Sequence, residues 1–190
     1  MDPRLSIFPD ALLSEYRLRD ADHKSVKPDW ISASFPALQL VYLRCRQSDD
    51  MINEGEVRLI AAYLSKFLKT IPNLNLRIGV IAPGASQRDR LDQVLSELIT
   101  ESKILVKTAD VFLSQECDLI IVSLTEKRSS SSVSFIDSAL TRAKTAFWLF
   151  GDIRITTLVD QFARFSDRCS VIEADQPDLS MTITFDHCDE

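Results

Sequence analysis

Segments with the period of a helix alternate along this chain with short, almost uniformly apolar segments of strand length. The runs LRIGVIA (76–82) and CDLIIVSL (117–124) are the clearest of these apolar segments. A strand that is apolar at nearly every position is buried on both of its faces, as in a parallel sheet that helices cover. The alternation therefore predicts an α/β fold with a mainly parallel sheet and helices on both faces, in three layers.

Capping signals and apolar periodicity place two helices. Asn53, followed three positions later by Glu56, resembles a capping box, and it begins a helix that should end near Pro72. Ser86 with Asp89 can cap the second helix. Further strands are expected at 38–43, in ILVKT (104–108), at 145–151 and at 169–172, with further helices at 134–144 and 155–166.

The length of 190 residues and the charge distribution bound the organisation of the chain. At roughly 150 residues per domain, the length predicts one main domain. We expect a wrapping arm at 1–36, the main domain at 37–175 and an acidic tail at 176–190. No Lys or Arg follows Arg168, so residues 1–172 carry no net charge and the net charge of −6 comes from the end of the chain. A dedicated, sequence-independent nucleic-acid binder has a basic body, which this chain lacks.

Targeting and metal-binding signals are weak in this sequence. The acidic and basic residues near the start do not suit a signal peptide, and no apolar run approaches the roughly 20 residues of a membrane span. We therefore expect an intracellular protein, cytoplasmic or nuclear, with no membrane partner. The four cysteines are 72, 52 and 19 positions apart, which fits no zinc site, and neither histidine has triad neighbours, so we expect no metal held by this chain alone.

Four motifs occur in order along the chain: NEGE (53–56), IGVIAPGASQ (78–87), TADVFLSQECDLIIVS (108–123) and ALTRAK (139–144). Together they resemble the C-terminal RecA-like lobe of the superfamily 1 helicases related to senataxin and to the nonsense-mediated-decay RNA helicase. The resemblance covers roughly residues 5–172, and ALTRAK is its most specific piece. It implies a RecA-like version of the three-layer α/β/α fold.

The resemblance also implies roles for individual residues near ATP. Arg142 corresponds to an arginine finger that reaches across an interlobe cleft toward the γ-phosphate, and Arg88 corresponds to a second catalytic group. Gln87 falls at a nucleotide-proximal position, and Glu116 falls where the family contacts the ribose. Phosphoryl transfer needs cationic groups with several donors at the developing charge, which suits Arg142. A surface ion pair is the alternative reading of Arg142.

Thr108 and Thr141 fall, by the same resemblance, in segments that grip the nucleic-acid backbone. The chain departs from the family pattern where Gly84 replaces an aromatic residue and where Leu113-Ser114 follows Phe112 in place of Gln-Gly. These changes remove a base-stacking group and a glycine that lets the backbone approach a ligand. Because residues 1–172 carry no net charge and the acidic end of the chain repels phosphate, we expect weak, salt-dependent binding of single-stranded RNA or DNA.

The sequence contains no G-x-x-x-x-G-K-[ST] loop to cradle phosphates and no internal acidic motif to hold Mg²⁺. We therefore expect no ATP hydrolysis by this chain alone, and ATP only in a site shared with a Walker-bearing lobe. The resemblance implies the second lobe of an RNA or DNA helicase, with the N-terminal helicase lobe as its partner. The alternatives are a degenerate, freestanding adaptor that binds a partner protein, or an unrelated flavodoxin-like domain.

Overall fold

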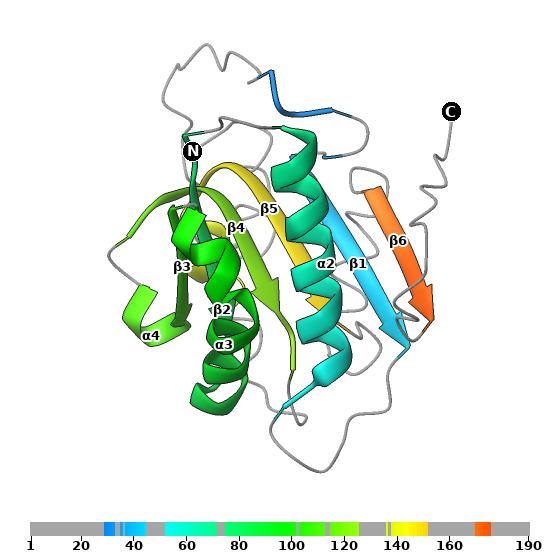
Figure 1. The fold of residues 1–190 in the computed structure, drawn as a ribbon, viewed down its shortest axis with the longest axis vertical. Coiled ribbons are helices and arrows are strands. Elements are labelled where there is room, and N and C mark those ends of the chain that lie inside the picture. Colours follow the sequence, from blue (N-terminus) through cyan, green and yellow to red (C-terminus); the bar gives the residue numbers. More distant parts are fainter. Residues whose placement is uncertain are drawn as a thin grey trace, which may run out of the picture.

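The computed structural model describes residues 29–32, 35, 37–44, 52–71, 75–101, 103–112, 115–125, 136, 138–151 and 170–175. Six strands form one sheet in the order β3-β2-β4-β5-β1-β6, and every neighbouring pair is parallel (Figure 1). The strands are β1 (Leu38–Arg44), β2 (Arg77–Ala82), β3 (Lys103–Thr108), β4 (Cys117–Ser123), β5 (Ala143–Gly151) and β6 (Ser170–Asp175). The helices are α2 (Glu54–Thr70), α3 (Ala85–Glu101) and α4 (Ala109–Phe112). The predicted parallel α/β architecture is confirmed.

Helices α2 and α3 cover one face of the sheet (Figure 1). Their apolar side chains recur every three or four positions, and they pack on alternate residues of the central strands. Phe67 of α2 lies at the centre of an aromatic group, with ring centroids 5.0 Å from Phe35, 5.2 Å from Trp148 and 5.6 Å from Trp30. Trp30 and Phe35 come from the segment predicted as a wrapping arm, and both are buried in this core.

The short helix α4 and the helical residues 138–140 pack on the opposite face of the sheet. Ile120 and Val122 of β4 face this layer, whereas Leu119 and Ile121 face α2 and α3. Because both faces of β4 are covered, its residues are apolar in succession rather than in alternation. Phe112 of α4 reaches β2 at Gly79, where any side chain would collide with its ring.

Three predicted boundaries differ from the structure. The helix predicted at 134–144 is wrong at its end, because residues 138–140 are helical and β5 begins at Ala143. The chain joins the sheet one residue earlier, where the Arg142 carbonyl accepts the backbone N–H of Cys117 at the start of β4 (3.0 Å). Ser86 is not an N-cap, because α3 begins at Ala85 and the Gly84 carbonyl accepts the Arg88 N–H (3.0 Å). The last strand is longer than predicted.

Several predictions concern residues outside the described part of the chain. These are the helix at 155–166, most of the arm at 1–36 and the acidic tail at 176–190. The division of the chain at residues 37 and 175 therefore stays a prediction.

Candidate functional site

Five buried polar residues lie together where α2 and α3 begin and β4 ends. We call this group the Glu56 cluster; its members are Asn53, Glu56, Gln87, Ser123 and Thr125, each at most 9% exposed. In open parallel sheets, ligand sites form at the carboxyl ends of the strands, and the cluster lies at this edge. A polar group of this size inside a protein is stable only if its members satisfy one another.

The Glu56 carboxylate is the centre of this cluster. Its Oε2 accepts hydrogen bonds from the hydroxyls of Ser123 (2.5 Å) and Thr125 (2.8 Å), and its Oε1 accepts from the Asn53 side-chain amide (3.1 Å). Burial raises the pKa of Glu56 to about 7, although the hydrogen bonds from Ser123, Thr125 and the backbone of Leu124 favour the charged form. All of these partners are neutral, and in the described part of the chain no cation lies within ion-pair distance of the carboxylate.

Only one half of the predicted capping box forms. The Asn53 side chain accepts the Glu56 N–H (3.2 Å), as an N-cap does. The Asn53 N–H, however, donates to the Gln87 side chain (2.9 Å) rather than to Glu56. Glu56 is therefore free of its local capping role and joins α2 to the end of β4.

The raised pKa of Glu56 makes the free energy of unfolding depend on pH. Its folded pKa of about 7 lies above the ordinary 4.5, so the folded state holds a proton that the unfolded chain releases, and stability falls as pH rises from about 4.5 to 7. Between pH 5.5 and 7.5 this single group should lower the free energy of unfolding by about 2 kcal/mol. Urea denaturation of Glu56→Gln should lose this component, whereas Glu54→Gln, on the same helical turn, should keep it. An equal pH dependence in both variants would contradict the assignment.

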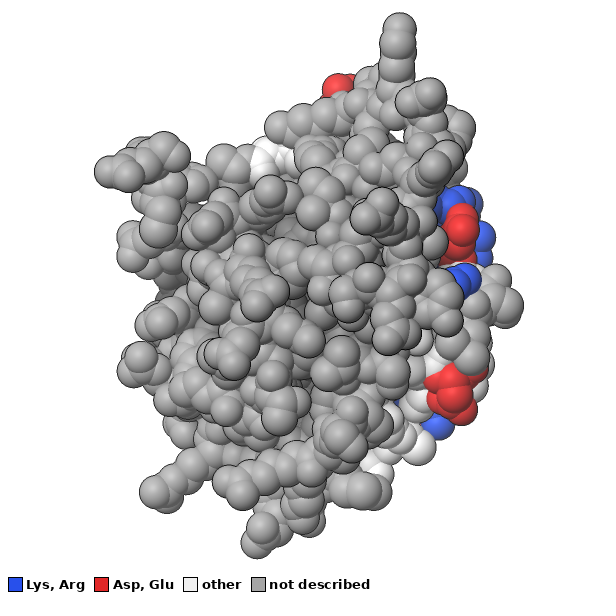
Figure 2. Space-filling view, turned by 180° about the vertical axis from the view of Figure 1, so that it is seen from behind, with Lys and Arg blue, Asp and Glu red and all other residues white. Residues whose placement is uncertain are grey.

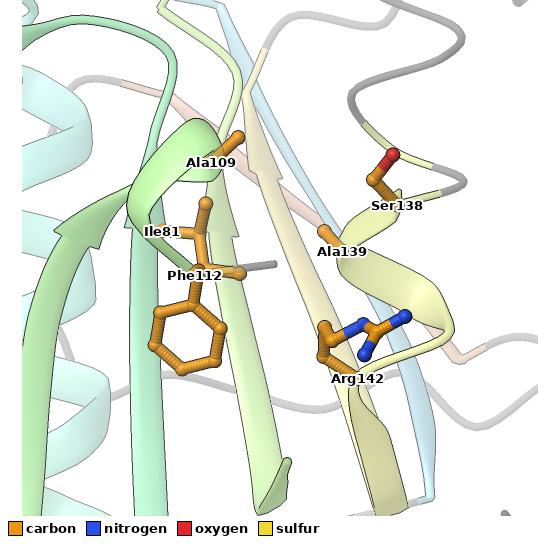
Figure 3. Close-up of a pocket in the computed structure, with 6 residues that line it drawn as sticks. All are labelled: Ile81, Ala109, Phe112, Ser138, Ala139 and Arg142. Carbon is orange, nitrogen blue, oxygen red and sulfur yellow. The ribbon is translucent and has the colours of Figure 1, made fainter. Parts of the chain in front are cut away.

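A shallow pocket lies on the sheet face opposite α2 and α3, between α4 and the segment that precedes β5 (Figure 3). Its lining residues are Ile81, Ala109, Phe112, Ser138, Ala139 and Arg142. Arg142 backbone groups are fixed, since its N–H donates to Ala139 (3.1 Å) and its carbonyl accepts from Cys117. Its side-chain Nε is buried and has no hydrogen-bond partner. A buried donor without a partner on a cationic side chain is rare in proteins, and it leaves this Nε able to donate to an acceptor from outside the chain.

The other predicted site residues occupy different surroundings. Gln87 is fully buried in the Glu56 cluster, whereas the next side chain, Arg88, is 35% exposed. The Arg88 Nε lies 2.9 Å from Asp89 Oδ1, but like the Arg142 Nε it is buried and has no hydrogen-bond partner. The Glu116 side chain is exposed, and its Oε2 lies 3.8 Å from the Nζ of Lys144. Gln87 and Arg88 thus belong to the layer of α3, and Arg142 belongs to the opposite layer.

The two threonines predicted to contact nucleic acid both have local partners. The Thr141 hydroxyl donates to the Ser138 carbonyl (2.9 Å), beside the pocket. The Thr108 hydroxyl bonds the carboxylate of Asp110 and thereby lowers its pKa. Seen from behind, described side chains of both charges lie along the edge on the side of β3 and α4 (Figure 2). This edge is mixed in charge rather than basic.

A family model described as an AAA domain matches residues 1–154. The chain belongs to this AAA domain family. The match covers most of the sheet and all of α2, α3 and α4. The predicted RecA-like fold is confirmed with it.

Curated relatives of this AAA domain are helicases. The chain is 28% identical to the helicase sen1 of Schizosaccharomyces pombe over 185 residues, which cover 88% of this chain and 11% of that protein. It is 26% identical to the helicase SEN1 of Saccharomyces cerevisiae over 176 residues, 81% of this chain and 8% of the relative. The DNA polymerase alpha-associated DNA helicase A of Saccharomyces cerevisiae is 27% identical over 109 residues, 54% of this chain and 16% of that protein. The resemblance to superfamily 1 helicases of the Sen1 type is confirmed, and the chain spans a small part of each relative.

The described residues contain neither a membrane-spanning helix nor a group of metal ligands. Among them, no helix is long and apolar enough to cross a membrane. Within the same part of this AAA domain, no three His, Cys, Asp or Glu side chains lie together as ligands for a metal ion.

Proposed function

We propose that this domain is the second RecA-like lobe of a superfamily 1 helicase, which completes an ATP site and a single-strand channel when it meets a Walker-bearing N-terminal lobe. In this proposal Arg142 is the arginine finger, Arg88 is a second cation at the phosphates and Glu116 contacts the ribose. The chain does not hydrolyse ATP alone, because it has no phosphate-binding loop and no magnesium ligands of the helicase type.

The unpaired Nε of Arg142 carries the proposal. Leaving a buried donor unsatisfied costs about 1 to 3 kcal/mol, and more on a charged group, so such a donor persists where a ligand supplies the acceptor. A phosphate oxygen is a suitable acceptor, because the planar guanidinium offers several parallel donors. Among the described residues, no carboxylate lies within ion-pair distance of Arg142, which disfavours the alternative of a surface ion pair.

Glu116 and the two threonines must change partners to act as proposed. The Glu116–Lys144 contact is long and exposed, so a ribose hydroxyl can replace it at small cost. Thr108 and Thr141 each have a single hydroxyl proton, which Asp110 and the Ser138 carbonyl now accept. Each hydroxyl has to give up its present partner before it donates to a nucleic-acid phosphate. The energy lost with that partner supports the expectation of weak nucleic-acid binding.

A chimera tests the proposed function. This chain replaces the matching segment of the Schizosaccharomyces pombe helicase sen1, and ATP hydrolysis is measured with and without single-stranded RNA or DNA. We expect turnover from the chimera and none above background from the isolated chain or from sen1 with the segment deleted. A folded chimera without turnover would contradict the second-lobe proposal and favour the adaptor, which needs no catalytic lobe.

A further inference from the structure

Gln87 is a fully buried polar side chain whose amide has a protein partner at each end. Its Oε1 accepts the Asn53 backbone N–H (2.9 Å), and its Nε2 donates to Ser123 Oγ (3.0 Å). The same Nε2 lies 3.5 Å from the Asn53 carbonyl oxygen. Because this side chain is not exposed to solvent, a nucleotide cannot contact it in this structure. Gln87 therefore has the surroundings of a structural residue rather than of a nucleotide-binding residue.

The hydrogen-bond directions specify the residue type at position 87. When Glu56 is ionised, Ser123 donates its single hydroxyl proton to Glu56 Oε2, so the Ser123 oxygen can only accept from a third group. The Asn53 N–H needs an acceptor on the other side of Gln87. Glutamine supplies both functions at one side-chain end, whereas glutamate lacks the donor and methionine lacks the donor and a good acceptor.

Among the described residues, Gln87 is the side chain whose hydrogen bonds hold the first turn of α3, and one turn further Arg90 pairs with Glu54 of α2 (2.6 Å). Gly84 stands at the N-cap position without a capping side chain, and the first turn contains no acidic residue. The Gln87 bonds to Asn53 and Ser123 therefore anchor this turn to the start of α2 and to the end of β4. Consecutive helical residues point about 100° apart, so an anchored Gln87 also sets the direction of Arg88.

We propose that Gln87 is a positioning residue that holds the first turn of α3 and thereby presents Arg88 to the nucleotide, and that it does not bind the nucleotide itself. The part of this inference that concerns Arg88 rests on the proposed function. The anchoring of α3 is a property of the isolated domain and can be measured without any nucleotide.

The first arm of the test uses the chain alone. Hydrogen exchange of the Arg88 amide, whose N–H donates to the Gly84 carbonyl in the first turn of α3, is measured in the wild type, in Gln87→Met and in Leu95→Ala, a buried apolar control on the same helix. We expect Gln87→Met to accelerate this exchange about tenfold beyond the control at matched stability, since one buried hydrogen bond contributes about 1 kcal/mol or more. Equal exchange in the two variants would overturn the anchoring.

The second arm uses the sen1 chimera. Gln87→Met should lower kcat about tenfold and leave KM for ATP within about twofold, because a misdirected Arg88 weakens the transition state rather than ground-state binding. It should add no further loss to Arg88→Ala, since both variants remove the same contact. A raised KM with unchanged kcat, additive with Arg88→Ala, would assign Gln87 to the nucleotide and overturn the proposal. If the unsubstituted chimera is inactive, the proposed function fails, and the exchange measurement still decides the anchoring.

Discussion

Arg142→Lys should reduce ATP hydrolysis by the sen1 chimera about a thousandfold, the size of effect that an arginine finger has on phosphoryl transfer. Lysine keeps the positive charge, but it lacks the planar fork that can bond two phosphate oxygens, and its shorter reach moves the charge away from them. The measurement is the steady-state rate at saturating ATP and single-stranded nucleic acid.

A matched control separates this effect from the loss of any arginine. Arg90 lies on α3 and pairs with Glu54 at 2.6 Å, so its guanidinium is already neutralised by a carboxylate. Arg90→Lys should change the rate by no more than about threefold, as surface substitutions away from a site usually have small effects. Arg142→Lys should not lower the urea midpoint of the isolated chain, because it removes a buried donor that has no partner there. A chimera that hydrolyses ATP equally well with Lys at position 142 would remove Arg142 from the catalytic site.

Gly151→Ala should lower the free energy of unfolding by about 3 to 5 kcal/mol, from backbone strain and overpacking together. Gly151 ends β5 with φ of +150°, a conformation that L side chains rarely adopt. An added Cβ would collide with the Cβ of Leu124 and lie 3.2 Å from Glu56 Oε1, so neither the backbone nor the buried cluster can give way cheaply. Denaturant unfolding of the isolated chain measures the loss.

Gly84→Ala is the control for this prediction. Nothing lies within 4 Å of a Cβ added at Gly84, so alanine should change stability there by no more than about 1 kcal/mol, the cost of an exchange at an N-cap. Equal losses at positions 84 and 151 would show that Gly151 is not held by Leu124 and Glu56 in the way described.

The central strands were predictable because strands that are buried on both faces have apolar residues at consecutive positions. The run CDLIIVSL is apolar on both faces, and β4 occupies Cys117–Ser123 with covered faces on both sides. The N-cap at Asn53 was equally accessible, since its partner Glu56 lies only three residues away. Local patterns of this kind carried the fold class and the start of α2.

The Glu56 cluster was not predictable from local patterns, because its bonds join distant segments. Glu56 contacts Ser123 and Thr125, which follow it by 67 and 69 residues, and Gln87 contacts Asn53 across 34. An acidic residue at the third position of a helix normally faces solvent or its own cap, so nothing near Glu56 in sequence indicates burial. The one available signal was the polar residue Ser123 at the end of an otherwise apolar run.

The end of the helix before β5 illustrates a second limit. Apart from Thr141, the segment ALTRAK consists of good helix formers, which favours a helix to position 144. In the structure the sheet takes over at Ala143, because β4 and β5 pair from Cys117 and Ala143 onward. Tertiary pairing outweighs propensity here, and it places Arg142 at the junction of helix and strand, where its Nε is buried.

The most direct test of the second-lobe proposal is the structure of the sen1 chimera with a non-hydrolysable ATP analogue and Mg²⁺. The measurement is the distance from the Arg142 guanidinium nitrogens to the oxygens of the γ-phosphate. We predict a distance of about 3 Å, that of a charge-assisted hydrogen bond, with the Nε or an Nη as donor. The proposal would be contradicted if the other lobe fully binds the analogue while Arg142 lies more than about 6 Å from every phosphate oxygen. That separation is too long for a hydrogen bond.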